Sequence, residues 1–178
     1  AVKKAGVAGV MGAYNRTNGE PCCASKTLMQ DILRKDWQFK GYYVSDCGAI
    51  KDIWEFHKFA PTMKEAAAVS LKTGCNLNCG ESYKYLIDAY EEDLITDEDI
   101  TEAAEYLYTI RAALGEFEDN RPYSDIGYEK LDSDENKELN LKASEETMVL
   151  LKNENNFLPL NKSDYKKVAV VGPNSMSH

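Results

Sequence analysis

Short apolar runs alternate with amphipathic stretches along the first part of the chain. Residues 7–14 and 41–45 are rich in small, β-branched and aromatic side chains, which favours buried strands. Residues 25–36 and 62–73 carry apolar side chains at helical spacing, so we expect two helices, the second ended by Gly74. Strands that alternate with helices are typical of βα units around a parallel sheet, and the sequence therefore predicts an α/β fold.

The middle of the chain contains the clearest helix signal. Residues 75–78 are short and strand-like, and residues 83–94 have an apolar stripe that predicts a helix. Thr96 and Asp99 then form a capping-box pattern, which marks the start of a helix that we expect to end at Gly115. The apolar stripe of this helix is predicted to pack in the core rather than to form a binding surface.

The pattern changes after the last of these helices, at residue 116. Residues 116–132 contain Pro122, Gly127 and many charges, which is typical of a linker. Residues 133–151 again have a helical pattern with acidic side chains in the first half. The apolar run at 167–171 predicts a buried strand.

The composition suits a folded acidic protein. Apolar residues make up 43% of the 178 residues, which is enough for a hydrophobic core. The net charge of −9 and the pI of about 4.8 argue against nucleic acids and anionic membranes as partners, because both require basic patches. No apolar run approaches the roughly 20 residues of a membrane span. The chain begins with Ala1 rather than Met, so we expect a piece of a longer protein, and its oligomeric state is left open.

The cysteine pattern bears on metal binding and on the compartment. Five cysteines stand at positions 22, 23, 47, 75 and 79. Their spacing does not match zinc-ligand patterns, so no metal site is expected. The odd count argues against a complete disulfide framework and favours buried free thiols in a cytoplasmic protein, with secretion as the alternative.

Asp46 is the candidate reactive residue. It follows the second expected strand directly, and Gly48 opens the next turn. In parallel α/β folds the carboxyl ends of the strands carry the chemistry. Aspartate is also common as a helix cap, so the position alone is compatible with a structural role.

An ordered set of motifs surrounds Asp46 along nearly the whole chain. The motifs are Gly-Val-Met-Gly-Ala-Tyr-Asn at 9–15, Asn-Gly-Glu-Pro at 18–21, Leu-Arg-Lys-Asp-Trp at 33–37, Val-Ser-Asp-Cys-Gly at 44–48, Glu-Ala-Ala at 65–67, Gly-Cys-Asn-Leu-Asn-Cys-Gly at 74–80, Val-Leu-Leu-Lys-Asn-Glu at 149–154 and Val-Val-Gly-Pro at 170–173. The set resembles glycoside hydrolase family 3, the retaining exo-acting β-glycosidases. Cysteine after the acid, with Asn-Cys-Gly further on, is similar to the β-xylosidase branch, whereas the β-glucosidase branch usually carries Trp or Ala there.

The resemblance implies a division into parts. Residues 1–115 would be the C-terminal part of a TIM-like (β/α) barrel, 116–134 a linker, and 135–178 the first elements of an α/β sandwich domain. The family commonly has glycine where this chain has Gln38, at an expected helix end, and we expect that change to affect only the turn.

The resemblance also implies an activity. The parent protein would hydrolyse xylo-oligosaccharides from the non-reducing end as a β-xylosidase, with no cofactor. β-Glucosidase and α-L-arabinofuranosidase activities are the alternatives within the family. The family's sugar-gripping residues and its general acid/base Glu are expected outside residues 1–178, so we expect these residues alone to be inactive.

Site residues are carried over by their motifs. Asp46 matches the nucleophile, and Tyr14 matches a tyrosine that would hydrogen-bond the Asp46 carboxylate. Met11 matches an apolar contact near the sugar, and Cys47 would form the wall beside the sugar ring. A plain core tyrosine and a plain core methionine are the structural alternatives. Cys47 and Cys79 are expected to meet, because each would end a neighbouring barrel strand.

Other interpretations stay open at this point. A non-catalytic carbohydrate-binding module would keep the same fold, and Val-Val-Gly-Pro at 170–173 after a strand weakly suggests a nucleotide-binding domain. His57 and His178 pair with no nucleophile at a recognisable spacing, so we expect surface positions for them. Arg16 and Glu20 are expected in a solvated loop.

Overall fold

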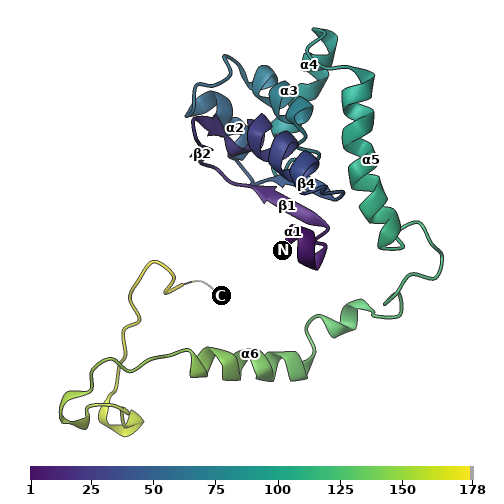
Figure 1. Ribbon diagram of the computed structural model, residues 1–178. Helices are drawn as coiled ribbons and strands as arrows, with labels where there is room; N and C mark the ends of the chain where they lie inside the picture. Colours follow the sequence, from purple (N-terminus) through teal and green to yellow (C-terminus); the bar gives the residue numbers. More distant parts are fainter. Residues whose placement is uncertain (177–178) are drawn as a thin grey trace. The chain divides into compact units, whose positions relative to one another are not determined.

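The computed structural model describes residues 1–176, and the chain divides into two compact units, residues 1–124 and 125–178 (Figure 1). His178 lies outside the described residues. Both helices and strands are present, so the chain has the mixed α/β structure that the sequence predicts.

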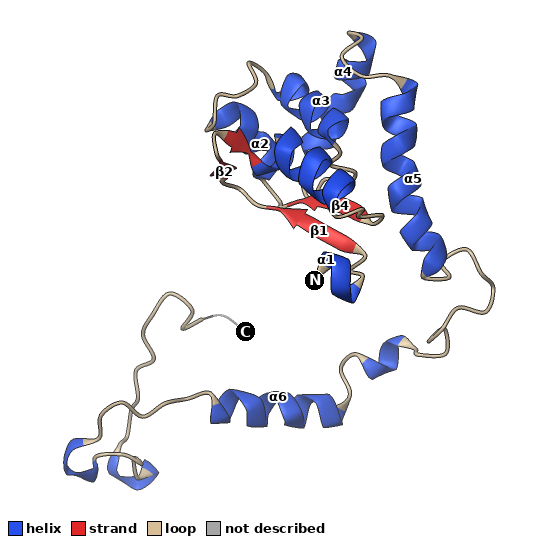
Figure 2. Ribbon diagram, viewed as in Figure 1, coloured by secondary structure: helices blue, strands red, loops and turns tan. Residues whose placement is uncertain are grey.

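Two parallel strands form the centre of the first unit. β1 (Gly9–Gly12) pairs with β4 (Tyr42–Ser45) along their whole length, and Val44 makes a further parallel bridge to Leu77. Both strands were predicted and are shorter than their apolar runs. The predicted strand at 75–78 is reduced to that single bridge. Figure 2 shows β1 and β4 side by side, with α2 (Ala49–Glu55) and α3 (Met63–Thr73) on one side of them.

A short hairpin and several helices complete the first unit. The hairpin consists of β2 (Arg16–Thr17) and β3 (Glu20–Pro21), joined through the expected turn at Asn18 and Gly19. The other helices are α1 (Val2–Ala5), η1 (Cys22–Ala24), η2 (Thr27–Asp36), η3 (Ser82–Tyr85), α4 (Leu86–Glu91) and α5 (Asp97–Ala113).

The core lies between the strands and the helices η2, α2 and α3. Along β4, Tyr43 and Ser45 are buried, whereas Tyr42 and Val44 are only half-buried, as expected when one face of a sheet is covered. The buried side chains that meet Tyr43 in this core include Cys23, Met29, Leu33, Phe39, Ile50, Ile53, Ala66 and Cys75.

The predicted helix ends are confirmed where local capping chemistry sets them. The Thr62 hydroxyl accepts the amide of Glu65 at the start of α3, and Gly74 ends that helix with φ of 114°. Thr96 and Asp99 form the predicted capping box at the start of α5. Side-chain oxygens at such positions satisfy amides that the first helical turn leaves unpaired.

Two predictions for this unit are only partly correct. The helix expected over 83–94 is split into η3 and α4, and it stops at Glu91 before Asp93, which has φ of 57°. In the stripe of α5, Ala103 is buried, but Leu114 is 71% exposed. Within the first unit α5 packs on α3 and β4, which cover only part of that stripe.

The second unit contains α6 (Asp134–Glu146), with Ser133 as its cap, and the short turns η4 (Tyr128–Lys130), η5 (Glu154–Asn156) and η6 (Lys162–Asp164). The helix expected to reach residue 151 therefore ends at Glu146. The buried strand expected at 167–171 is wrong, because this segment forms no strand and Val171 is 88% exposed. A strand needs a neighbour for its backbone groups, and residues 125–176 supply none.

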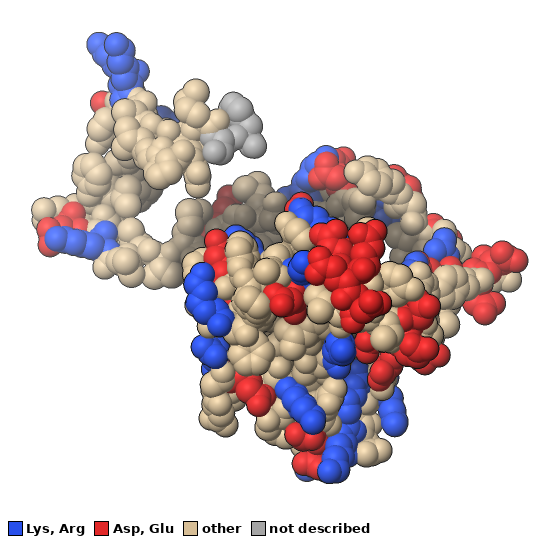
Figure 3. Space-filling model, turned by 90° about the horizontal axis from the view of Figure 1, so that it is seen from above, with Lys and Arg blue, Asp and Glu red and all other residues tan. Residues whose placement is uncertain are grey.

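No helix among residues 1–176 combines the length and the apolar character that a membrane crossing requires. Acidic side chains gather on the face shown in Figure 3. The turn between α4 and α5 carries exposed acids at Glu91, Glu92, Asp93, Asp97 and Glu98. Such a surface repels polyanions.

Arg34 on η2 ties several segments of the first unit together. Its Nη1 donates to the carbonyl oxygens of Phe39 (3.1 Å) and Gly41 (2.6 Å), and its Nη2 donates to Oδ1 of Asn76 (2.9 Å). The guanidinium also lies over the Tyr106 ring, 3.9 Å from its centroid. Burial lowers the pKa of Arg34, yet arginine stays protonated at any ordinary pH.

The turn that follows η2 contains Gln38, where the resembling family commonly has glycine. Gln38 has φ of 56°, a left-handed conformation in which glycine carries no steric cost. Its side-chain Nε2 donates to the carbonyl of Lys35 (2.6 Å) and so closes the helix end. Gln38 thus lies in the turn where the change was expected to act, and its effect stays a prediction.

We expect Arg34→Lys to lower the free energy of unfolding by about 2 kcal/mol, because one ammonium cannot reproduce three hydrogen bonds and the stacking on Tyr106. Urea unfolding of the variant, compared with Arg121→Lys at an exposed loop position, provides the measurement. The control should change stability by less than about 0.5 kcal/mol. Equal effects at both positions would contradict the assigned role of Arg34.

Candidate functional site

The parallel register brings the candidate residues to one edge of the strand pair. Gly12 at the end of β1 lies opposite Ser45 at the end of β4, and the amide of Asp46 donates to the carbonyl of Gly12 (2.9 Å). The residues that follow the two strands therefore leave the sheet next to each other. Tyr14 lies two residues after the end of β1, and Asp46 lies one residue after the end of β4.

Asp46 is half-buried and open on one side. Its Oδ1 accepts a hydrogen bond from the amide of Cys47 (2.7 Å), the one bond that its carboxylate makes within residues 1–176. Gly48, not Asp46, occupies the cap position of α2, and no side chain caps that helix. The helix-cap interpretation of Asp46 is therefore wrong, and the second carboxylate oxygen is available to a ligand.

Tyr14 contacts the same turn in a different way from the one predicted. Its hydroxyl accepts a hydrogen bond from the amide of Gly48 (3.0 Å), and the structure shows no bond from Tyr14 to Asp46. Because the hydroxyl oxygen is the acceptor there, its own proton stays available for a second partner. Tyr14 is 43% exposed, so the alternative of a plain core tyrosine is wrong.

Met11 lies on β1 with 61% of its surface exposed. The alternative of a plain core methionine is therefore wrong. Its side chain is available to an apolar contact on the uncovered side of the strand pair, which is the role that the resemblance implies.

Cys47 and Cys79 meet as predicted, with their sulfur atoms 2.9 Å apart. The Ser45 hydroxyl sets this approach, because it accepts hydrogen bonds from the Cys79 amide (3.1 Å) and from Nδ2 of Asn78 (2.9 Å). Both thiols are exposed and free. The hydrogen bond to Cys79, the charges of Cys79 and Asp46, and partial desolvation raise the pKa of the Cys47 thiol.

The other three cysteines are buried free thiols, as one of the two interpretations predicted. Cys22, Cys23 and Cys75 lie in the core beneath β4, and Tyr43 donates its hydroxyl proton to the Cys22 carbonyl (3.1 Å). In the part of the chain that the structure describes, no group of three or more His, Cys, Asp or Glu side chains is arranged to hold a metal ion.

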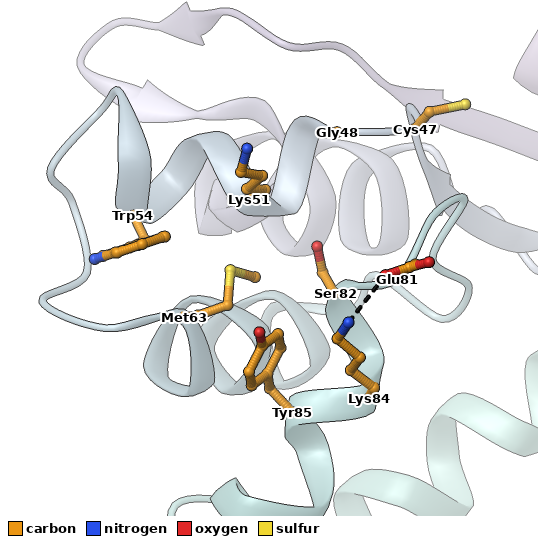
Figure 4. A pocket seen from close by; sticks show the side chains of 9 residues that line it. All are labelled: Cys47, Gly48, Lys51, Trp54, Met63, Glu81, Ser82, Lys84 and Tyr85. Atoms are coloured by element: carbon orange, nitrogen blue, oxygen red, sulfur yellow. Dashed lines mark hydrogen bonds and ion pairs between the residues drawn. The ribbon is translucent and has the colours of Figure 1, made fainter.

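A cavity of about 340 Å³ opens beside the Cys47–Gly48 turn (Figure 4). Trp54, Met63 and Tyr85 face into it, whereas the sulfur of Cys47 points away. Its other lining side chains are Lys51, Glu81, Ser82 and Lys84. Aromatic and hydroxyl groups of this kind suit a sugar, but both lysines are already paired, Lys51 with Glu55 (2.6 Å) and Lys84 with Glu81 (2.9 Å). The sequence pattern did not predict this cavity, because its walls come from four separate elements.

Two residues near the site have partners that sequence reasoning missed. Glu20, expected in a solvated loop, accepts hydrogen bonds from the hydroxyls of Ser25 (2.5 Å) and Thr27 (3.2 Å) at the start of η2. The Ser25 bond in particular lowers the pKa of the Glu20 carboxyl. His57, expected as a plain surface residue, is half-buried, and its ring Nε2 lies 2.8 Å from the carbonyl oxygen of Tyr14.

Comparison with known proteins assigns the family. Residues 1–110 match the family model for the glycosyl hydrolase family 3 N terminal domain. This match covers more than half of the chain, so the chain belongs to glycosyl hydrolase family 3.

Relatives within the family include xylosidases from plants and fungi. The chain is 37% identical over 171 residues to β-D-xylosidase 1 of Arabidopsis thaliana, covering 95% of this chain and 22% of the relative. It is 40% identical over 178 residues to a probable exo-1,4-β-xylosidase of Aspergillus clavatus, covering 97% and 23%. The chain thus spans about a fifth of the length of these relatives.

Solved structures of the family are also similar. A GH3 exo-β-xylosidase in complex with a xylobiose aziridine probe superposes with a TM-score of 0.69 at 35% identity, covering 90% of this chain and 21% of that one. A β-glucosidase from Listeria innocua in complex with isofagomine gives a TM-score of 0.64 at 32% identity, covering 88% and 22%.

The thiol geometry predicts selective chemistry. In the native protein we expect an alkylating reagent to label Cys47 and Cys79 rapidly and Cys22, Cys23 and Cys75 only after unfolding, because the latter three are buried. Labelling of Cys47 should speed up as the pH rises, since its thiol pKa is raised and the thiolate is the reactive form. Peptide mass spectrometry after timed alkylation is the measurement, with Cys47→Ser as the control. Uniform labelling of all five cysteines would disprove the assigned burial.

Proposed function

We propose that the protein is part of a retaining β-glycosidase that removes β-D-xylose units from the non-reducing ends of xylo-oligosaccharides. One observation carries this proposal: the Asp46 carboxylate stands open at the carboxyl end of β4, inside the Ser45–Gly48 turn that matches the family nucleophile motif. The names of the xylosidase relatives support the choice of sugar.

Asp46 would act as the nucleophile. Retaining hydrolysis uses two carboxyl groups about 5–5.5 Å apart, one to attack the anomeric carbon and one to protonate the leaving oxygen and then activate water. The Cys47 amide donates a hydrogen bond to one Asp46 oxygen and so orients the carboxylate for the attack. The second carboxyl group, the general acid/base, is assigned to no residue of this chain.

Contacts to the sugar would come from the same edge of the strand pair. The Tyr14 hydroxyl has a proton left for a sugar oxygen or for Asp46. Met11 would supply an apolar contact, and Cys47 with its partner Cys79 would form a wall beside the ring. No cofactor enters this chemistry, and the compartment stays a prediction, with the cytoplasm favoured over secretion.

β-Glucosidase activity is the second candidate. The similarity to the Listeria innocua β-glucosidase favours it, whereas cysteine at position 47 favours the xylosidase. An α-L-arabinofuranosidase side activity is a third outcome. Parallel assays of the full-length protein on nitrophenyl xyloside, glucoside and arabinofuranoside would separate these activities.

For the domain organisation we propose the division that the resemblance implies. Residues 1–115 would be the end of a (β/α) barrel, which the parallel pairing of β1, β4 and Leu77 supports. The boundary between the two compact units, after Ser124, falls within the proposed linker 116–134. Residues 135–178 would begin the sandwich domain. A nucleotide-binding domain is disfavoured, because residues 165–171, directly before Gly172, contain no strand.

We expect Asp46→Asn in the full-length enzyme to abolish turnover while the fold is kept, because an amide cannot form the glycosyl–enzyme ester. The matched control is Asp52→Asn, the same change one turn into α2, which should retain activity. Steady-state rates on an aryl xyloside and thermal unfolding are the measurements. An Asp46→Asn enzyme with more than a small residual rate would refute Asp46 as the nucleophile, whereas a wild-type full-length protein without any turnover would favour the non-catalytic binding module.

The 178-residue chain expressed alone should show no glycosidase activity. It lacks an assigned general acid, and general acid–base catalysis is commonly worth about 10² to 10⁴ in rate. The test is hydrolysis of an aryl xyloside by purified residues 1–178, with the full-length protein as the positive control. Measurable hydrolysis by the chain alone would contradict the expectation that residues 1–178 are inactive without the rest of the protein.

A further inference from the structure

We propose that His57 and Arg16 are positioning residues that hold Tyr14 against the turn carrying Asp46. The proposal rests on Asp46 being the nucleophile. Neither residue contacts Asp46, so their effect would pass through Tyr14 and Gly48. The two segments that they join are the loop around the β2–β3 hairpin and the end of α2.

The first link is the His57 ring. Its Nε2 lies 2.8 Å from the carbonyl oxygen of Tyr14, although the two residues are far apart in sequence. A carbonyl oxygen only accepts hydrogen bonds, so Nε2 must carry the proton. Beyond Gly12 the chain has left β1, and the His57 ring gives the Tyr14 carbonyl a hydrogen-bond partner outside the strand ladder.

The second link is the Arg16 side chain, which connects the hairpin to His57. Its Nη1 donates to the carbonyl of His57 (3.3 Å), while its Nε donates to the carbonyl of Gly19 in the hairpin turn (2.9 Å). One guanidinium thus spans both segments, which its rigid fork of donors allows. Arg16 in the hairpin therefore donates a hydrogen bond to the His57 carbonyl after α2, and the His57 ring donates one to the Tyr14 carbonyl before the hairpin.

His57 is itself held firmly enough to serve as a support. Its amide donates to the carbonyl of Asp52 at the end of α2 (2.8 Å). The next residue, Lys58, has φ of 52°, a left-handed conformation that carries a steric cost for a residue other than glycine. Backbone strain of this kind persists where the surrounding contacts require it.

The last link joins Tyr14 to the nucleophile turn. The Tyr14 hydroxyl accepts the amide of Gly48, and a Cβ built on Gly48 would lie 3.3 Å from Cε1 of Tyr14. The ring therefore packs on the Gly48 backbone. Gly48 is two residues from Asp46, whose carboxylate is aimed by the amide of Cys47 between them. A shift of Tyr14 would let this turn move and would misplace the attacking oxygen.

The test uses two variants that differ by one methylene. In His57→Gln the amide nitrogen can take the place of Nε2, whereas in His57→Asn it reaches only the position of Nδ1. Each is introduced into the full-length enzyme and treated with 2-deoxy-2-fluoro-xylosyl fluoride, which reports the attack step directly because fluoride leaves without an acid. Both the rate constant of inactivation and the concentration at half-maximal rate are measured.

We expect His57→Asn to inactivate about 10- to 100-fold more slowly, with little change in the half-maximal concentration, since small misplacements of a reacting group cost this much. His57→Gln should recover most of the rate. In a Tyr14→Phe background, which cuts the link to Gly48, His57→Asn should have much less effect. Arg16→Met, at an exposed position, should slow inactivation in the same direction without disturbing the core.

Hydrogen exchange adds a readout that does not depend on the reaction. The Gly48 amide should exchange faster in His57→Asn than in the wild type or in His57→Gln. Three results would each overturn the positioning role while leaving Asp46 as the nucleophile. They are equal inactivation rates for His57→Asn and His57→Gln, an effect of His57→Asn that adds fully to that of Tyr14→Phe, and unchanged exchange of the Gly48 amide. A wild-type enzyme whose label appears on a residue other than Asp46 would instead overturn the proposed function and this inference together.

Discussion

The parallel pairing of β1 with β4 is the constraint on which the rest of the site depends. It places Gly12 opposite Ser45, and the bond from the Asp46 amide to the Gly12 carbonyl extends the ladder by one step. Gly12 makes this register possible, because a Cβ there would lie 2.5 Å from the Cys23 sulfur and 2.6 Å from the Tyr43 hydroxyl. A slip by one residue would turn every side chain to the opposite face and remove Asp46 from the open edge.

What the sequence predicted well has local causes. The caps Thr62 and Thr96 and the end at Gly74 follow from hydrogen bonds and dihedral angles within one turn of chain. The two strands were predicted because β-branched and aromatic runs are distinctive. The meeting of Cys47 and Cys79 followed once the resemblance placed both at neighbouring strand ends, since parallel strands share an edge.

What it predicted poorly depends on partners far away in sequence. The run at 167–171 is apolar enough for a strand, yet a strand exists only with a neighbour, and residues 125–176 contain none. The bonds of His57 to Tyr14 and of Arg34 to Asn76 join residues separated by 43 and 42 positions. No periodicity or motif signals such pairs, because the turn geometry between them decides whether they meet.

The buried interior and the edge of the strand pair that carries Asp46 are held in place in different ways. Beneath the strands, Tyr43, Cys23 and Cys75 are buried, and desolvation raises the pKa of the Tyr43 phenol. At the edge, Asp46 must be reachable by a substrate and therefore cannot be held by burial. Its geometry has to come instead from directional hydrogen bonds, of which the Cys47 amide and the Tyr14–Gly48 contact are the nearest. Such bonds align a group without covering it, which is why a reactive carboxylate can be both exposed and oriented.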